Sequence, residues 1–144
     1  MLLSNIPNYL SLLSFNPAKP NPTTPVTEIK SQDDYEKLLK KYKVVIINAN
    51  ASWAGPCKAM SPIYERLSNQ IPYNPEYFAL TKLDIDEVSD VAEKLDVPGI
   101  PFYMAYDDGK RKDNILMPGL STLQKFLISW SDKAHELGKE PEKK

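Results

Sequence analysis

The segment Ala51-Ser52-Trp53-Ala54-Gly55-Pro56-Cys57-Lys58 connects two stretches with different patterns. Before it, Val44–Ile47 is a continuous β-branched run, which is typical of a strand buried on both faces. After it, we predict a helix to about Ile71, and Pro62 inside that helix should kink it. The segment is therefore expected to form the loop between a central strand and a helix.

The bulk composition is that of an ordinary globular domain of 144 residues, with 42% hydrophobic and 26% charged residues. The net charge of −1 argues against a nucleic-acid-binding protein, which normally carries a basic stripe. No apolar stretch approaches the ~18 residues needed to span a bilayer. Cys57 is the only cysteine, so no intramolecular disulfide can form, and a reducing, cytoplasmic location is expected.

Three regions follow from the distribution of proline and charge. Residues 1–25 contain five of the 13 prolines, which favours an extended N-terminal linker, with a targeting segment as the alternative. Residues 26–137 carry the alternating patterns of a folded domain. Residues 138–144 form a charged tail that should fray.

The domain reads as β-α-β-α-β-α-β-β-α. Asp107-Asp108-Gly109 predicts a hairpin turn, because Asp-Gly tolerates positive φ, and the charged run to Asp113 is interpreted as a solvated turn. Ser31 should begin the first helix. The other predicted elements are strands at Val26–Ile29, Phe78–Asp84, Phe102–Tyr106 and Ile115–Met117, and helices around Val91–Leu95 and Leu123–Trp130.

Three loop segments in this order resemble the thioredoxin family: the segment around Trp53–Cys57, Gly99-Ile100-Pro101, and Gly119-Leu120-Ser121. The resemblance covers about residues 26–130. It implies an α/β thioredoxin fold, a central mixed sheet of four to five strands flanked by helices on both faces. It also implies a cis peptide bond before Pro101.

The resemblance also implies chemistry that this sequence lacks. Active members use two cysteines flanking Gly-Pro, the first as the attacking thiolate and the second to resolve the mixed disulfide. Here the attacking position is Ala54 and the resolving position is Cys57. The family's buried aspartate corresponds to Asn48, although its usual lysine neighbour remains as Lys82.

Two further positions depart from the family pattern. Asn50 stands where the family usually has an aromatic residue, and Phe102 stands where it commonly has threonine. Loss at several positions favours a protein that acts by binding proteins or peptides, without dithiol–disulfide oxidoreductase activity. The alternative is an otherwise active thiol–disulfide oxidoreductase in which alanine replaces the cysteine at position 54.

Cys57 has two interpretations: a buried, inert side chain, or a lone thiol that acts as a monothiol redox sensor. A shallow peptide-binding surface is predicted from Trp53, Gly55, Pro56, Ile100, Pro101 and Gly119, unless these residues only preserve loop geometry. A protein or peptide partner is expected there, on a monomer or weak dimer.

Asp84 and Asp86 are interpreted as solvated strand-end residues. The only histidine, His135, is far from every motif, so no metal site and no cofactor are expected.

Overall fold

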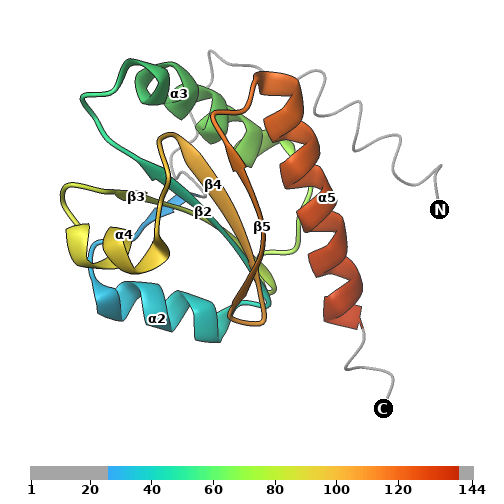
Figure 1. The fold of residues 1–144 in the computed structure, drawn as a ribbon. Helices are drawn as coiled ribbons and strands as arrows, with labels where there is room; N and C mark the ends of the chain where they lie inside the picture. Colours follow the sequence, from blue (N-terminus) through green and yellow to red (C-terminus); the bar gives the residue numbers. More distant parts are fainter. Residues whose placement is uncertain (1–25, 140–144) are drawn as a thin grey trace.

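The computed structural model describes residues 26–139 and contains one mixed sheet of five strands in the order β1-β3-β2-β4-β5 (Figure 1). The predicted extension at 1–25 and the tail beyond Lys139 lie outside the described residues. The order of elements agrees with the sequence prediction. They are β1 Val26–Glu28, α2 Gln32–Lys41, β2 Val44–Asn50, α3 Gly55–Gln70, β3 Phe78–Asp84, α4 Ser89–Leu95, β4 Phe102–Asp107, β5 Lys110–Leu116 and α5 Leu120–Lys139.

Strand β2 is the centre of the sheet. It pairs in parallel with β3 and antiparallel with β4, and its residues from Val44 to Ala49 are all buried. Its side chains alternate between two cores, since Val44 and Ile46 belong to one cluster and Val45 and Ile47 to the other. A strand covered on both faces needs apolar residues at every position, which explains the continuous β-branched run.

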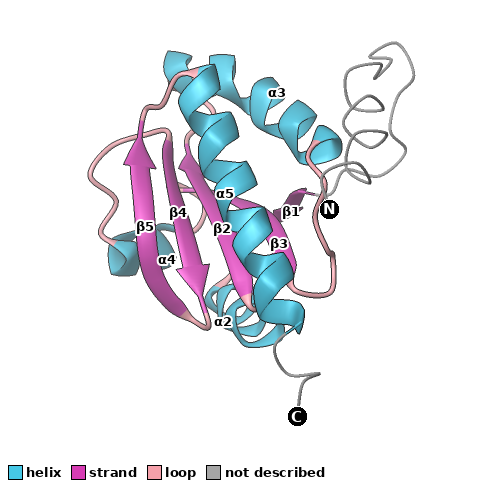
Figure 2. Cartoon of the chain, turned by 90° about the vertical axis from the view of Figure 1, so that its right-hand side faces the viewer, coloured by secondary structure: helices cyan, strands magenta, loops and turns pink. Residues whose placement is uncertain are grey.

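The helices form two layers on the sheet, as Figure 2 shows, with α3 and α5 on one face and α2 and α4 on the other. Tyr64 of α3 and Leu127 of α5 pack in the first core. Tyr35 of α2 and Leu95 of α4 pack in the second. The arrangement is the predicted one, a central mixed sheet of five strands flanked by helices on both faces.

Helix α2 begins where the sequence predicts. The Ser31 side chain accepts a hydrogen bond of 3.0 Å from the Asp34 amide, which satisfies one of the free donors of the first turn. Acidic residues in that turn and basic residues in the last turn complement the helix dipole. Helix α3 continues through Pro62 to Gln70 as one element, so the proline does not end it.

The hairpin turn is smaller than the sequence analysis predicted. Asp108 and Gly109, both with positive φ, form the turn, and β5 already begins at Lys110 instead of Ile115. Most of the charged run is therefore strand. It pairs with β4 on one side only, and an edge strand of this kind needs no apolar alternation and is protected from aggregation by its charges.

Two buried tyrosines differ in how their hydroxyl groups are satisfied. The rings of Tyr64 and Tyr103 meet edge to face, with centroids 5.3 Å apart. The Tyr64 hydroxyl donates a 2.8 Å hydrogen bond to the Thr81 carbonyl. The Tyr103 hydroxyl is buried and has no hydrogen-bond partner among residues 26–139. Desolvation raises the pKa of both hydroxyls above that of a free tyrosine.

The two tyrosines should therefore respond in opposite ways to replacement by phenylalanine. Tyr64→Phe removes a satisfied donor and should lower the free energy of unfolding by about 1 kcal/mol. Tyr103→Phe removes an unsatisfied hydroxyl and should raise it by about 1 kcal/mol. Urea unfolding at pH 7 measures both values, and the two variants are matched controls for each other. Equal destabilisation by both would contradict this account of the Tyr103 hydroxyl.

Candidate functional site

The loop between β2 and α3 lies at the carboxyl ends of the parallel strands. It leaves the sheet at Asn50, whose carbonyl accepts a 2.9 Å hydrogen bond from the Ile85 amide beyond β3. The loop turns tightly, with a 3.2 Å hydrogen bond from the Ala54 amide to the Ala51 carbonyl. Ala51, Ala54 and Cys57 form a small buried cluster against which Ile100 packs. The loop and the Ile100–Pro101 segment, far apart in sequence, are therefore neighbours.

Ala54 is the N-cap residue of α3. Its backbone is extended, and its methyl group makes no capping hydrogen bond. Pro56 in the first turn has no amide hydrogen, so a capping side chain would accept from the Cys57 amide. Alanine at this position supplies neither a nucleophile nor a hydrogen-bond acceptor for the helix N-terminus.

Cys57 lies in the first turn of α3 and is 4% exposed. It also lines a pocket of about 280 Å³ between α3 and the ends of β1, β2 and β3. The thiol is thus buried against the loop, in agreement with the first interpretation of the sequence. It nevertheless forms part of the wall of a surface pocket.

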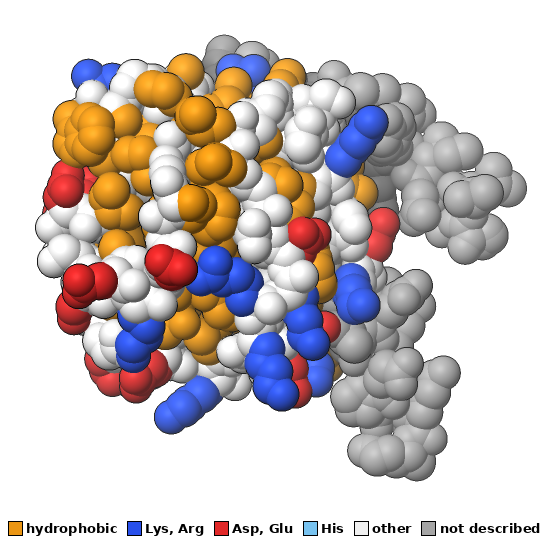
Figure 3. All heavy atoms as spheres, in the orientation of Figure 1, with side chains coloured by type: hydrophobic (Ala, Val, Ile, Leu, Met, Phe, Trp, Pro, Cys, Tyr) orange, Lys and Arg blue, Asp and Glu red, His pale blue; other side chains and the backbone are white. Residues whose placement is uncertain are grey.

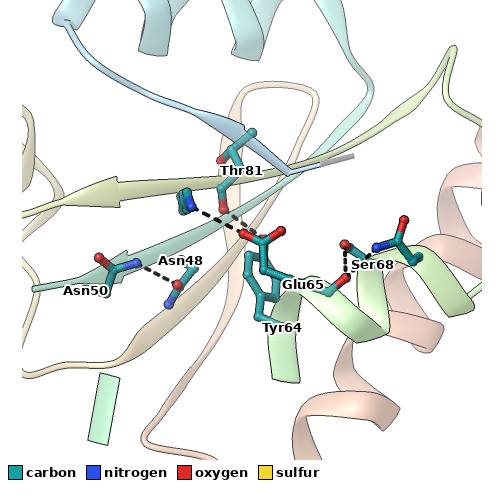
Figure 4. Close-up of polar contacts among 8 residues, drawn as sticks. Asn48, Asn50, Tyr64, Glu65, Ser68 and Thr81 are labelled. Atoms are coloured by element: carbon teal, nitrogen blue, oxygen red, sulfur yellow. Dashed lines mark hydrogen bonds and ion pairs between the residues drawn. The ribbon is translucent and has the colours of Figure 1, made fainter. Parts of the chain in front are cut away.

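Asn48 occupies the middle of a row of residues that crosses the sheet. It pairs with Lys82 on β3 and with Tyr103 on β4, and Lys82 pairs in turn with Glu28 on β1. The Asn48 amide oxygen accepts a 2.8 Å hydrogen bond from the Asn50 side chain. Figure 4 shows the two asparagines pointing toward each other. Two of the four positions that depart from the family pattern, Asn48 and Asn50, therefore form a neutral hydrogen-bonded pair.

The lysine of this row is paired with an acid that the sequence analysis did not identify. Lys82 Nζ lies 3.2 Å from Oε2 of Glu65, which extends from α3 toward the sheet (Figure 4). Both side chains are about one-third exposed, so the pair is partly shielded from water. No motif marks Glu65. The sequence offered one indication: a partly buried Lys82 beside a neutral Asn48 needs an acidic partner from another element.

Trp53 projects from the loop with 66% of its surface exposed. Its indole Nε1 donates a 2.6 Å hydrogen bond to Oδ2 of Asp86, in the turn after β3. The Asp84 carboxylate accepts from the amides of Asp86 and Glu87 and so holds that turn. Asp84 and Asp86 therefore lie at a strand end, as predicted, and in addition fix the turn and the exposed indole.

The Ile100–Pro101 peptide bond is cis. The Pro101 carbonyl accepts a 2.8 Å hydrogen bond from the Met117 amide, which joins this segment to the end of β5. No atom lies within 4 Å of where a Cβ on Gly119 would be, so the surface is open there. Phe102 is buried in the core beneath α2 and α4 and does not reach this surface.

Exposed apolar residues that the sequence analysis did not assign enlarge the predicted surface. Leu116, Met117 and Leu120 flank Pro118 and Gly119, and each is about half exposed. With Trp53 they are the large exposed hydrophobic residues of the part of the chain that the structure describes. Figure 3 shows hydrophobic side chains gathered as a band on the face seen in Figure 1. The structure thus combines exposed apolar side chains with a loop in which Ala54 carries no reactive group.

Residues 26–139 contain neither a cluster of metal-binding side chains nor a membrane-spanning helix. Within residues 26–139, no group of three or more His, Cys, Asp or Glu side chains could hold a metal ion. No helix in the same range is long and apolar enough to cross a membrane.

Comparison with known proteins identifies the family. The thioredoxin family profile matches residues 26–129. The chain belongs to the thioredoxin family. Thioredoxin-2 of Saccharomyces cerevisiae is 34% identical over 105 residues, which cover 72% of this chain and 97% of that protein. A thioredoxin of Coprinus comatus is 32% identical, covering 71% and 94%.

Solved structures of thioredoxins have the same fold. The thioredoxin of Malassezia sympodialis superposes with a TM-score of 0.68 at 28% identity, over 81% of this chain and 98% of that one. The Plasmodium falciparum thioredoxin superposes with a TM-score of 0.65 at 34% identity, over 72% and 97%. The family match thus spans the described domain from Val26 to residue 129.

The empty capping position predicts a stability effect at residue 54. Ala54→Thr and Ala54→Val introduce side chains of the same shape, but only threonine can accept a hydrogen bond from the Cys57 amide. The threonine variant should be more stable than the valine variant by about 1 kcal/mol, the usual value of an N-cap. Thermal or urea unfolding of the pair measures the difference. Equal stabilities would show that the helix start is already satisfied.

Proposed function

We propose that this thioredoxin-family chain binds an extended peptide or protein segment and does not catalyse dithiol–disulfide exchange. The binding surface consists of Trp53, Gly55, Pro56, Ile100 and Gly119, enlarged by Leu116, Met117 and Leu120. Pro101, predicted to be part of it, is buried and supports the surface from below. The observation that supports the proposal is Ala54 at the N-cap of α3, together with the exposed apolar side chains of Trp53, Leu116, Met117 and Leu120.

The chemistry of exchange explains why Ala54 matters. Reducing a substrate disulfide takes two thiols: one attacks and forms a mixed disulfide, and the other displaces the substrate. A methyl group has no lone pair and cannot attack. With Cys57 as the only cysteine, any mixed disulfide with the chain would have no internal thiol to resolve it.

Proton transfer at the resolving thiol is also impaired. Asn48 cannot take up a proton, because a neutral amide is not a base at physiological pH. Lys82 cannot readily orient a carboxylate at position 48, because its ammonium group already faces Glu65. The loss therefore extends from the loop into the sheet, and restoring one cysteine should not restore full activity.

The binding surface depends on groups that need no thiol. An extended peptide can pair with backbone groups near Ile100, as an added strand does at a sheet edge, while its apolar side chains contact Trp53 and Leu120. Asp86 fixes the indole of Trp53, and this reduces the conformational entropy lost on binding. The partner is therefore expected to present an extended segment rich in apolar side chains.

Reductase activity tests the first half of the proposal. In an insulin disulfide-reduction assay the chain should give only the background rate. Ala54→Cys should give weak activity, and Ala54→Cys with Asn48→Asp should give about 100-fold more, the lower end of what a positioned general acid–base group typically contributes. Ala54→Ser is the matched control, because its side chain has the size of cysteine without the thiol.

An active oxidoreductase parent is the second candidate, favoured by the overall likeness to thioredoxins. Robust reductase activity of Ala54→Cys alone would support it and contradict natural loss of the activity. Turnover by the unaltered chain well above background would contradict both.

Peptide affinity tests the second half of the proposal, that the Trp53 surface binds an extended segment. A peptide selected from a random displayed library on the intact chain should bind less tightly to Trp53→Ala by about 2 kcal/mol or more, the loss typical of a central interface residue. Asp86→Ala should weaken binding by a smaller amount, because the indole is released but still present. Glu87→Ala, its exposed acidic neighbour, is the control and should leave the affinity unchanged. Affinities measured by calorimetry that do not respond to Trp53→Ala would rule out this surface.

A further inference from the structure

The apolar side chains of the Trp53 surface are left uncovered by residues 26–139. Leu116 lies at the end of β5, Met117 follows it, and Leu120 begins α5, and these side chains are 47%, 55% and 54% exposed. Trp53 is 66% exposed. Soluble proteins seldom leave several large apolar side chains in water on one face, and such a face commonly marks the binding site of another segment.

The backbone of Met117 is a second sign of a binding position. Its φ of 48° is in the left-handed region, which is disfavoured for a residue with a side chain. The amide of Met117 is held there by its hydrogen bond to the Pro101 carbonyl. Strained residues of this kind are concentrated where proteins bind ligands and partners. The strain therefore falls on a residue whose apolar side chain is exposed.

Residues 2–15 of the same chain have the composition of an occupant. They carry no charged side chain, and eight of them are large and apolar: Leu2, Leu3, Ile6, Tyr9, Leu10, Leu12, Leu13 and Phe15. The side chains that form the Trp53 surface are also uncharged, so contact between the two removes apolar area from water without burying a charge. Residues 140–144, the other segment outside the structure, are four charged residues and a proline and do not suit this surface.

Strand register gives the distance that the chain must cover to reach the surface. Val26, at the start of β1, is level with Ile46 of β2, and Leu116 is level with Ala49 of β2. The two levels are about 10 Å apart along the strands. Strands β1 and β5 are the two edges of the sheet (Figure 2), about 19 Å apart. The distance from Val26 to Leu116 is therefore about 22 Å.

Residues 16–25 are long enough to cover it. Four of them are proline, which favours an extended polyproline conformation. At about 3.1 Å per residue these residues span about 31 Å, which leaves about 9 Å for a path round the end of the sheet. Phe15 and Leu13 are the first large apolar residues beyond this linker and can reach Leu116.

We propose that residues 2–15 bind the Trp53 surface of their own chain and compete with other peptides for it. This inference rests on the proposed function, because it names an occupant of the same surface. The chain is then a self-inhibited peptide binder, in which an incoming partner must displace the segment.

The linker makes weak binding sufficient. A short linker gives an attached segment an effective concentration on the order of 1 mM. A segment with a dissociation constant of about 100 µM would therefore cover the surface about nine-tenths of the time. Only the uncovered fraction can bind an outside peptide, so the apparent dissociation constant of that peptide rises about tenfold.

Two double variants of the full chain test the proposal. Leu12→Asp with Leu13→Asp places two charges at apolar positions of the segment. Ser11→Asp with Ser14→Asp is the matched control, because it adds the same charge to the same segment and keeps every apolar side chain. Residues 26–139 are unaltered in both variants, so all three chains carry the same folded domain.

Acrylamide quenching of tryptophan fluorescence measures how far Trp53 is covered, because Trp130, the only other tryptophan, is 9% exposed. The quenching constant of the leucine variant should exceed those of the unaltered chain and the serine variant at least about threefold, since most of the Trp53 population is uncovered. It should not depend on protein concentration. Equal quenching of the three chains would overturn the proposal. Protection that grows with protein concentration would also overturn it and would assign the segment to a second copy of the chain.

The affinity of the peptide selected from the displayed library separates this inference from the proposed function. The peptide should bind the leucine variant about tenfold more tightly than the other two chains. Equal affinities for the three chains, each reduced by Trp53→Ala, would overturn the inference and leave the proposed function standing. Affinities that Trp53→Ala leaves unchanged in all three chains would overturn the proposed function and this inference together.

Discussion

The pairing of β2 with β3 on one side and β4 on the other is the constraint on which the site depends. It buries β2 on both faces and sets Asn48 between Lys82 and Tyr103. The same pairing brings the loop after β2 against Ile100. Because the register is fixed by side chains in two separate cores, a slip of one residue would exchange the two faces. The geometry of the site is therefore secured by the core and does not need the catalytic residues to maintain it.

The fold therefore accommodates Ala54 and Asn48 without the groups that dithiol chemistry needs. Ala54 and Asn48 are tolerated because each is neutral and compact in a place where a charged group would need a partner. The charge left on Lys82 is balanced by Glu65 from the helix. The buried Tyr103 hydroxyl is the exception, since it has no partner among the described residues. Unsatisfied buried groups are uncommon in folded proteins and often mark functional positions.

The sequence predicted those features that depend on local patterns. The central strand, the loop with Trp53 and Cys57, and the Asp108-Gly109 turn follow from runs of apolar residues and from turn chemistry. The length of β5 did not follow, because an exposed edge strand is held by backbone pairing with β4 and its charged side chains carry no signal. Glu65, Tyr103 and the pocket were missed because they become neighbours only through strand register and helix placement. Asp86 was assigned to a strand end, but its bond to Trp53 joins residues that are distant in sequence.

The proposed function requires that binding at the Trp53 surface be independent of thiol chemistry. The most direct measurement is the affinity of a cysteine-free peptide for the Cys57→Ser chain and for the unaltered chain, by calorimetry under reducing conditions. The two dissociation constants should agree within about twofold, because Cys57 is buried behind the loop and contributes no bond to the peptide. A large loss of affinity in Cys57→Ser, with the fold preserved, would contradict this independence and would show that the Cys57 thiol takes part in binding.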